Sequence, residues 1–236
     1  MPPIISPWTA PPETIALAAG EVHLWRACLD VPDSTFASLQ TLLDPSEAAR
    51  AARLLDPVKA RRFTVGRALL RQILSLYLDA DPAGLVFGSG INGKPFLAGE
   101  GGRALSFNLS HSGPWALFAV TCGMEVGVDI EEIDPALDFE RLAAQFFTPG
   151  ENALLGEVSP ARRRRAFYRM WTRKEAWLKG MGWGFSVPSR DVGLLERASG
   201  EDAAWRVRSF PVGRGYLGAL AVGGEVGVVR RWEWPL

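Results

Sequence analysis

The chain of 236 residues is poor in the residues that build disulfide frameworks and zinc sites, since it contains two cysteines and two histidines. Cys28 and Cys122 lie far apart in the sequence, so neither a disulfide framework nor a zinc-binding spacing is indicated. The chain also lacks an excess of charge, because 26 lysines and arginines balance 26 aspartates and glutamates. We therefore expect no nucleic acid among its partners.

Long apolar runs are absent as well. No segment approaches the roughly 18 consecutive apolar residues of a membrane span. Residues 1–20 lack the basic part and the continuous apolar part of a secretory signal, and their many prolines predict an extended arm. The expectation is a cytoplasmic protein that has no membrane partner.

The chain does contain four clear sequence signals for the start of a helix. Each start joins a capping residue to a proline in the first turn: Asp44-Pro45, Asp56-Pro57, Thr148-Pro149 and Ser159-Pro160. Segments of high strand propensity predict strands at 22–29, 104–109, 115–121, 126–131, 205–210, 216–222 and 225–234. Helices and strands together predict an α+β protein.

The order of these elements repeats, because helices precede a strand hairpin in each half of the chain. Residues 118–130 (FAVTCGMEVGVDI) resemble residues 220–230 (LAVGGEVGVVR), and both read as a strand, a glycine turn and a second strand. Such an echo arises either from an internal duplication or by chance. We expect an arm at 1–20, an N-terminal half at 21–124 and a C-terminal half at 125–236.

Residues 126–131 alternate in a way that is typical of a strand with two different faces. The valines and the isoleucine share one face, whereas Gly127, Asp129 and Glu131 share the other. Two carboxylates at this spacing repel each other unless a cation lies between them, and magnesium favours carboxylates together with substrate phosphates. The alternative is an ordinary solvated strand face.

Residues 162–179 are predicted to form one helix, which is followed by a glycine-rich loop. Glu175 and Lys179 lie one turn apart on this helix. They are either a common helical ion pair or a third metal-binding carboxylate beside a diphosphate-binding lysine. A separate basic stripe is either solvated or docks an acidic partner helix, and it consists of Arg162, Arg165, Arg169 and Arg173.

Two further segments are predicted as polar turns. In 107–113 a strand ends, and Ser110 and His111 enter a turn in which the histidine could donate to a phosphate. A Ser-His hydrolase is not expected, because neighbouring strand residues point to opposite faces and no G-x-S-x-G motif exists. In 92–95, Lys94 and Pro95 belong to a second turn.

Taken in order, these segments resemble a known family. Asn-Gly-Lys-Pro at 92–95, Phe-Asn-Leu-Ser-His-Ser at 107–112 and Val-Gly-Val-Asp-Ile-Glu at 126–131 precede Trp-Thr-Arg-Lys-Glu-Ala-Trp-Leu-Lys at 171–179. The chain closely resembles the 4′-phosphopantetheinyl transferases of the surfactin-activator (Sfp) type over residues 44–190. The resemblance implies two similar halves related by a pseudo-twofold, with coenzyme A in the cleft between them.

The resemblance also implies the residues at the reacting end. Asp129, Glu131 and Glu175 match the carboxylates that bind Mg²⁺ in the family. Glu175 and Lys179 match catalytic positions, with Lys179 at the reacting phosphate. Glu151 matches a glutamate that acts as a base or as a water ligand in some members, but it also fits a capping box that begins at Thr148.

Further matches concern the nucleotide end of coenzyme A. The resemblance assigns Arg62, together with Arg50 or Arg53, to the 3′-phosphate, although solvated surface is the alternative for all three. It assigns Lys94 and Pro95 to the adenine. It assigns Ser110 and His111 to the adenosine phosphates.

The activity implied is a magnesium-dependent transfer of phosphopantetheine from coenzyme A to a serine of an apo acyl- or peptidyl-carrier protein. The reaction releases 3′,5′-ADP, and the type of family member implied is monomeric. One alternative is a non-catalytic protein that binds coenzyme A or another nucleotide on the same scaffold. A metal-dependent nucleotidyl hydrolase is another alternative, and the Trp-x-x-Lys-Glu pattern argues against it.

Overall fold

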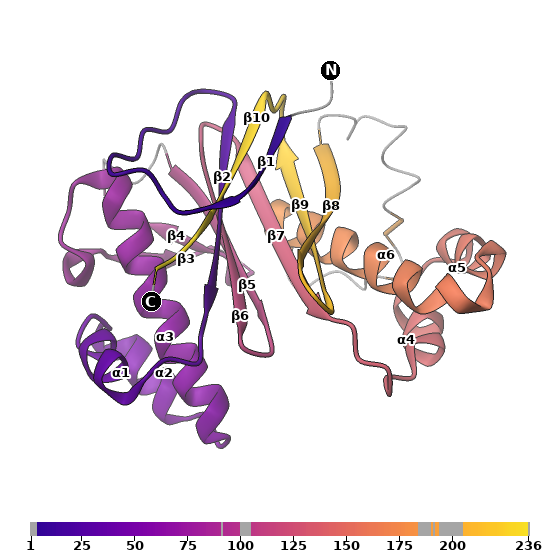
Figure 1. Cartoon of the computed structure of the whole chain (residues 1–236), viewed down its shortest axis with the longest axis horizontal. Helices are drawn as coiled ribbons and strands as arrows, with labels where there is room; N and C mark the ends of the chain where they lie inside the picture. The colour runs from indigo at the N-terminus through magenta and orange to yellow at the C-terminus, as the bar shows by residue number, and fades with distance from the viewer. Residues whose placement is uncertain are drawn as a thin grey trace.

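Two larger β-sheets lie side by side, and helices cover the face of each sheet that is turned away from the other (Figure 1). This computed structural model describes residues 4–90, 92–99, 105–183, 190, 192–193 and 205–235. The mixed architecture of two helix-covered sheets confirms the expected α+β fold class with two halves.

The first sheet has five strands in the order β1-β10-β2-β6-β5. The strands are β1 (Ile4–Thr9), β2 (Glu21–Cys28), β5 (Leu105–Ser112), β6 (Trp115–Cys122) and β10 (Val228–Glu233). β10 runs parallel to both of its neighbours, and the other pairs are antiparallel. The predicted N-terminal arm therefore contains a strand, and the two ends of the chain meet in one sheet.

Three helices cover this sheet: α1 (Asp33–Gln40), α2 (Pro45–Ala52) and α3 (Pro57–Leu78). The long helix α3 buries an apolar face that includes Leu69 and Ile73, and the sheet contributes Trp25, Phe107 and Phe118 to the same core. A short 3-10 helix, η1 (Pro82–Gly84), and a small hairpin of β3 (Phe87–Ser89) and β4 (Pro95–Leu97) follow α3.

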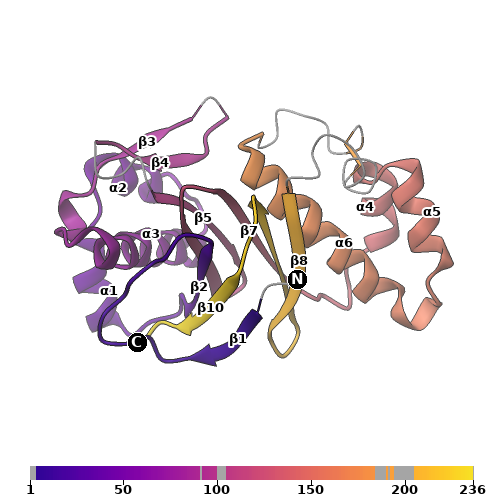
Figure 2. The same cartoon turned by 90° about the horizontal axis from the view of Figure 1, so that it is seen from above.

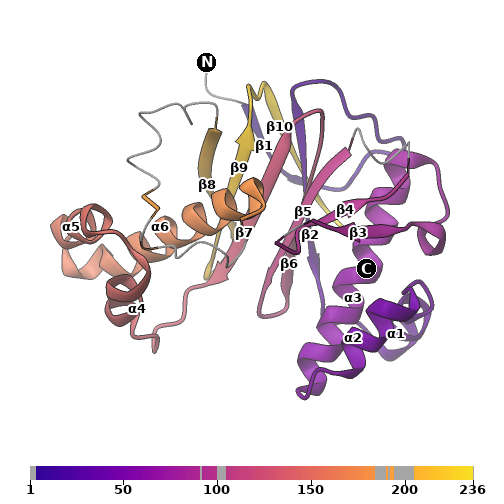
Figure 3. The same ribbon diagram turned by 180° about the vertical axis from the view of Figure 1, so that it is seen from behind.

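The second sheet has three antiparallel strands in the order β7-β9-β8, which are β7 (Glu125–Glu132), β8 (Trp205–Gly213) and β9 (Tyr216–Gly223). The helix α6 (Pro160–Met181) lies across its outer face (Figure 3). The shorter helices α4 (Phe139–Phe146) and α5 (Pro149–Glu157) pack against the N-terminal part of α6.

The chain crosses between the sheets twice, at the two segments that echo each other in the sequence. The hairpin β5–β6 belongs to the first sheet, and the chain then passes Gly123 into β7 of the second. The hairpin β8–β9 belongs to the second sheet, and the chain passes Gly224 back into β10 of the first. Both glycines have positive φ, at 70° and 139°, a region that favours glycine. The repeated connection is what a pseudo-twofold relation of the halves requires.

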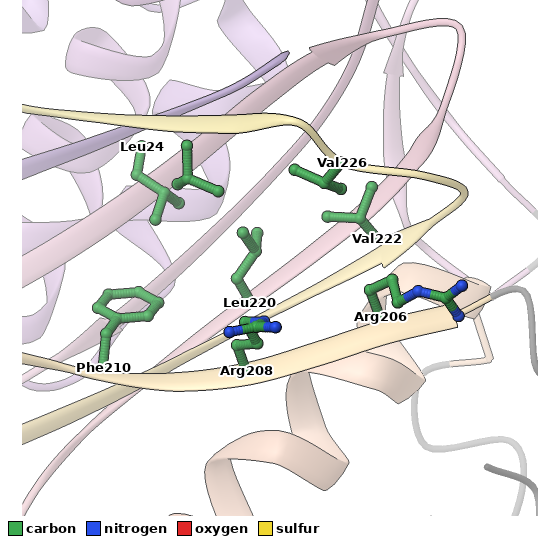
Figure 4. Close-up of a pocket in the computed structure, with 8 residues that line it drawn as sticks. Leu24, Arg206, Arg208, Phe210, Leu220, Val222 and Val226 are labelled. Atoms are coloured by element: carbon green, nitrogen blue, oxygen red, sulfur yellow. The ribbon is translucent and has the colours of Figure 1, made fainter. Parts of the chain in front are cut away.

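An apolar layer fills the space between the sheets and contains Leu24 of β2, Leu117 of β6, Val128 of β7 and Leu220 of β9. A small pocket within this layer is lined by apolar side chains together with Arg206 and Arg208 of β8 (Figure 4). Because six of the eight side chains that line it are apolar, we assign this pocket to the packing of the sheets rather than to a phosphate-binding site.

The local predictions hold at most element starts. α2, α3, α5 and α6 begin at the prolines expected for them, and Asp44 and Thr148 each complete a capping box. The predicted strand 225–234 begins later, at Val228, because the preceding residues form the crossover from β9. Residue 104, predicted to open a strand, lies outside the described residues. In the described ranges, no helix has both the length and the apolar character that crossing a membrane requires.

A chain of polar contacts runs along one face of β2 and includes a side chain of α3. The indole Nε1–H of Trp25 donates to Tyr77 Oη at 2.9 Å, and Tyr77 Oη lies 2.9 Å from Nδ1 of His23. Nε2 of His23 lies 3.4 Å from a carboxylate oxygen of Glu21. His23 is fully buried, and this burial lowers the pKa of its imidazole to about 4.

We predict that His23 makes the protein less stable in mild acid. Its folded-state pKa lies below the unfolded value near 6.5, so the unfolded chain binds the proton more readily and stability is lost as pH falls from about 6.5 to 4. Between pH 7 and pH 5 this loss is about 2 kcal/mol, measurable by urea unfolding. The variant His23→Gln is expected to lose less on acidification than the parent, and Gln40→Ala, which changes an exposed side chain that does not titrate, is the control that keeps the full loss. Equal losses in His23→Gln and the parent would contradict the assignment.

Candidate active site

The backbone of α6 lies directly against β7 at Gly127. A Cβ atom on Gly127 would lie 2.0 Å from the carbonyl oxygen of Ala176 and 2.3 Å from the amide nitrogen of Gly180. No side chain fits there, so only glycine allows the helix to approach this closely. The approach brings the C-terminal turns of α6, with Glu175 and Lys179, beside the polar face of β7.

Asp129 occupies the centre of this contact and is 2% exposed. Its Oδ1 accepts hydrogen bonds from Lys179 Nζ at 2.6 Å and from the Ser110 hydroxyl at 2.9 Å. Lys179 Nζ also donates to Ser110 Oγ at 2.8 Å. Oδ2 of Asp129 is buried and has no hydrogen-bond partner within the described residues. Burial raises the pKa of this carboxyl, although Lys179 and Ser110 act against the shift.

Glu131 and Glu175 add further negative charge around Asp129. Burial raises the pKa of Glu131 to about 7, and the charge of Asp129 contributes to the same shift. The pKa of Glu175 is raised by burial and then by Asp129. The charge of Asp129 thus disfavours the ionised forms of both glutamates, and Lys179 supplies a positive charge that bonds directly to Asp129.

The donor set fits a hard divalent cation. A buried carboxylate oxygen without a partner and mutually repelling carboxylates are what such an ion would satisfy. Within the described residues, no three His, Cys, Asp or Glu side chains form a ready-made metal-binding group. Asp129 and one neighbouring carboxylate would therefore hold the ion, with phosphate oxygens and water as the remaining ligands.

Ser110 and His111 lie in strand β5, so the prediction that they enter a turn was wrong. The strand continues to Ser112 because its residues pair with β6 up to Trp115, and the turn comes at Gly113 and Pro114. Ser110 is buried, whereas His111 is exposed. The surrounding protein still desolvates the imidazole enough to lower the pKa of His111, and the charges of Lys179 and Arg62 lower it further.

The turn before β4 reaches from the N-terminal half to the end of α6 (Figure 2). Lys94 Nζ donates to the carbonyl oxygen of Gly180 at 2.7 Å and pairs with Glu125 at 2.6 Å. The side-chain amide of Asn92 donates to the carbonyl oxygen of Gly182 at 2.9 Å. Pro95 opens β4 directly after this contact.

Of the three arginines expected at a 3′-phosphate, one has a strong partner in the protein. Arg62 donates from Nε and from a terminal nitrogen to the two carboxylate oxygens of Asp30, each at 2.7 Å. Arg50 is exposed and lies over the ring of Phe63 at 5.3 Å, and Arg53 is exposed at the end of α2. In the part of the chain that the structure describes, no contact joins Arg50 or Arg53 to the Asp129 cluster.

Glu151 is 3% exposed and fully engaged in the fold. Its Oε2 accepts the amide N–H of Thr148 at 2.9 Å, and the amide of Glu151 donates to the Thr148 hydroxyl at 3.2 Å. The same carboxylate pairs with the buried ammonium of Lys174 at 2.6 Å. These contacts favour the capping-box interpretation of Glu151 over that of a base.

Asn108 and Ser112 were not predicted from the sequence as site residues, and both lie on the same face of β5 as Ser110. Asn108 Oδ1 accepts the amide N–H of Val128 at 2.9 Å, and the Ser112 hydroxyl donates to Glu131 at 3.0 Å. The available signal was the spacing of polar residues at 108, 110 and 112, which puts all three on one strand face.

The basic stripe of α6 is largely open to solvent. Arg162, Arg165 and Arg169 are exposed, and Arg173 is half-buried with an Nε that has no hydrogen-bond partner among the described residues. The intervening Arg163 and Arg164 behave differently, because they bond to backbone carbonyls near α4 and α5.

Comparison with known proteins identifies the family. A model described as "4′-phosphopantetheinyl transferase, N-terminal" matches residues 28–123, and one described as "4′-phosphopantetheinyl transferase superfamily" matches residues 125–212. The 4′-phosphopantetheinyl transferase HetI of Nostoc sp. is 42% identical over 96% of this chain and 98% of its own. The chain belongs to the 4′-phosphopantetheinyl transferase superfamily. It is therefore a transferase enzyme.

Two other relatives agree with this assignment. A putative 4′-phosphopantetheinyl transferase of Synechocystis sp. is 34% identical over 80% of each chain. A 4′-phosphopantetheinyl transferase of Bacillus subtilis is 35% identical over 59% of this transferase and 60% of its own length. The two family models together span both halves of the transferase and meet near the first crossover.

The contact at Gly127 gives a prediction for the transferase. Gly127→Ala forces α6 away from β7 and is expected to lower the free energy of unfolding by about 3 kcal/mol or more, because the methyl group meets backbone atoms that cannot move separately. Gly156→Ala is the matched control, since a Cβ there meets nothing within 4 Å and alanine favours a helix by about 0.5–1 kcal/mol. Urea unfolding measures both. A Gly127→Ala protein as stable as the parent would refute the close approach.

Proposed function

We propose that this transferase moves the 4′-phosphopantetheine group of coenzyme A to a serine of an apo acyl- or peptidyl-carrier protein, with magnesium, and releases 3′,5′-ADP. The observation that carries the proposal is the cluster in which Lys179 bonds to buried Asp129 beside Glu131 and Glu175. One cation and three carboxylates in this arrangement suit a diphosphate that arrives with a divalent metal ion.

In the proposed reaction, the serine Oγ of the carrier attacks the β-phosphorus of coenzyme A. The bond from that phosphorus to the bridging oxygen breaks, and the electron pair leaves with 3′,5′-ADP. Bound magnesium would neutralise charge on the diphosphate. Lys179 Nζ, held by Asp129 and Ser110, would contact the oxygens of the transferred phosphoryl group.

The proton of the attacking serine needs an acceptor, and we propose Glu175 for this role. Its carboxylate lies within the cluster, and its pKa is raised by burial and by Asp129, which makes it a better base than an ordinary glutamate. Glu151 is less suited, since its carboxylate holds the start of α5 and the buried Lys174.

The nucleotide end of coenzyme A is proposed to lie against the N-terminal half. Lys94 and Pro95 would border the adenine, and His111 would approach the adenosine phosphates. Arg62, aided by Arg50 or Arg53, would approach the 3′-phosphate. Because Arg62 is paired with Asp30, a phosphate there would either share the guanidinium or displace the carboxylate. We place the division of the halves at residue 124, with β10 returning to the first sheet.

The carrier protein is proposed to present an acidic surface. Three exposed arginines follow one another on α6, the helix that also carries Glu175 and Lys179, and none of the three has an ion pair among the described residues. Like charges one turn apart disfavour the helix, and an acidic partner would relieve that repulsion. A monomeric state and a cytoplasmic location stay predictions from the sequence.

The proposal predicts a defined change of mass. Incubation with coenzyme A, magnesium and a panel of apo acyl- and peptidyl-carriers is expected to add one phosphopantetheine group per carrier, and 3′,5′-ADP is expected as the second product. Intact-mass analysis measures the first product and chromatography the second. Folded protein that binds coenzyme A but modifies no carrier would favour the non-catalytic alternative. Release of nucleotide without modification of the carrier would favour a hydrolase.

Glu175→Gln is predicted to separate binding from chemistry. The change keeps the side-chain volume and removes one carboxylate charge and the proposed base, so loading of the carrier is expected to fall by about two to three orders of magnitude. Coenzyme A affinity is expected to stay within about tenfold, because the nucleotide contacts lie on the other half. Glu157→Gln, at an exposed position on α5, is the control with parent activity. If the Glu175→Gln enzyme loads carrier at the parent rate, Glu175 is not the base, and its role is limited to a helical ion pair with Lys179.

A further inference from the structure

β5 and β7 are neighbouring strands that belong to different sheets. The two strands pack side by side, yet backbone pairing joins β5 to β6 and joins β7 to β9. The joint between the two halves of the molecule therefore needs another kind of contact at this position. Polar side chains on one face of β5 provide it.

Three residues of β5 form a row, since they are spaced by two along a strand and so point the same way. Asn108 accepts the amide N–H of Val128, and Ser110 donates to Asp129. Ser112 follows at the end of the row. Each member therefore bonds to the next segment of β7, and the row runs along the strand that carries the metal-binding carboxylates.

Ser112 makes two hydrogen bonds with this strand. Its hydroxyl donates to Glu131 Oε2 at 3.0 Å, and its oxygen accepts the amide N–H of Glu132 at 3.0 Å. A serine hydroxyl has one proton to donate, so the amide contact fixes the oxygen and leaves that proton directed at the carboxylate. Glu131 is thereby held from the opposite half of the molecule.

Ser110 differs from Ser112 because its hydroxyl is already shared between Asp129 and Lys179. Its loss would disturb the ammonium as well as the carboxylate. Besides Glu131, Ser112 contacts the backbone amide of Glu132, and none of its described contacts involves Asp129 or Lys179. A change at Ser112 therefore removes the restraint on the Glu131 carboxylate without disturbing the ammonium.

We propose that Ser112 is a positioning residue for the metal site, which holds the Glu131 carboxylate in the orientation that binds magnesium. The inference rests on the proposed function, in which Glu131 is a ligand. Groups that orient metal ligands from behind commonly change metal affinity by about 10- to 100-fold when they are removed. A residue with a merely structural role would change the stability of the protein and leave the affinity for magnesium unaltered.

The chain offers a matched control on the same strand. Ser106 lies on the same face of β5, two residues before Asn108, and its side chain makes no hydrogen bond with the described residues. Ser106→Ala therefore removes the same atom from the same strand without touching a carboxylate. Ser112→Thr keeps the hydroxyl and serves as the conservative variant.

The test is a calorimetric titration of magnesium into the full-length protein with saturating coenzyme A and no carrier, corrected by a blank with coenzyme A alone. Ser112→Ala is expected to bind magnesium at least about tenfold more weakly than the parent. Ser112→Thr and Ser106→Ala are expected to stay within about twofold of the parent. Coenzyme A affinity without metal is expected to be alike in all four proteins. The melting temperature of Ser112→Ala is expected to fall by a few degrees, about 2–4 °C per kcal/mol, because the amide of Glu132 also loses its acceptor.

Three results would overturn the inference alone, and the first two are parent-like magnesium affinity in Ser112→Ala and an equal loss in Ser106→Ala. A loss of magnesium affinity that Ser112→Thr shares with Ser112→Ala would also overturn it, because the hydroxyl would then not be the responsible group. If the parent itself binds no magnesium beside coenzyme A, the proposed metal site fails, and this inference fails with it.

Discussion

The contact between α6 and β7 at Gly127 determines how close Glu175 and Lys179 of α6 lie to the carboxylates of β7. Two backbones meet there without a side chain between them, because a Cβ on Gly127 would fall within 2.3 Å of two atoms of α6. Asp129 comes two residues later on β7, and Lys179 directly precedes Gly180 on α6. The short bond between Lys179 and Asp129 thus depends on the absence of a side chain at Gly127, which lets the two backbones approach each other. A larger separation of the backbones would leave the carboxylate buried and unpaired, which is costly.

The two crossovers explain why the halves form one unit. β7 follows β6 directly but belongs to the second sheet, and β10 follows β9 directly but returns to the first. Each sheet therefore contains one strand, β10 in the first and β7 in the second, that directly follows a strand of the other sheet in the sequence. The apolar layer between the sheets draws on both, as with Leu24 and Leu220. Separating the halves would expose this layer, so the core fixes the relative positions of the two halves.

Much of this architecture could be predicted from the sequence, because the relevant signals are local. Proline with a capping residue marked the starts of α2, α3, α5 and α6, and alternation marked β7 with its apolar and polar faces. The order of the motifs indicated the family, which the comparisons confirm. The partners across the joint were not predictable in this way. Nothing local in the sequence pairs Ser112 with Glu131 or Arg62 with Asp30, since those contacts depend on how the two sheets and α3 are arranged.

The turn predicted at Ser110 and His111 was wrong because contacts between distant segments decide the structure there. Ser-His-Ser at 110–112 has the composition of a turn, but pairing with β6 keeps it in a strand, and tertiary context overrides local propensity in sheets. Glu151 was left open between a base and a cap. What favours the cap is Lys174, which is 23 residues away in the sequence and meets the carboxylate at 2.6 Å in a buried pair.

Lys94 connects the turn that precedes β4 to the C-terminal end of α6. Its ammonium lies at the C-terminal end of α6, where it bonds to the carbonyl oxygen of Gly180, and a positive charge is favourable at that end of a helix. Because it also pairs with Glu125 at the start of β7, the ammonium is already engaged by the two elements that meet at Gly127. An adenine bound at this turn would then meet Pro95, the backbone and the aliphatic part of Lys94 rather than its charge. Under the proposed function, the turn that borders the nucleotide is also one that holds the end of the helix carrying Glu175 and Lys179, so movement at one site would be felt at the other.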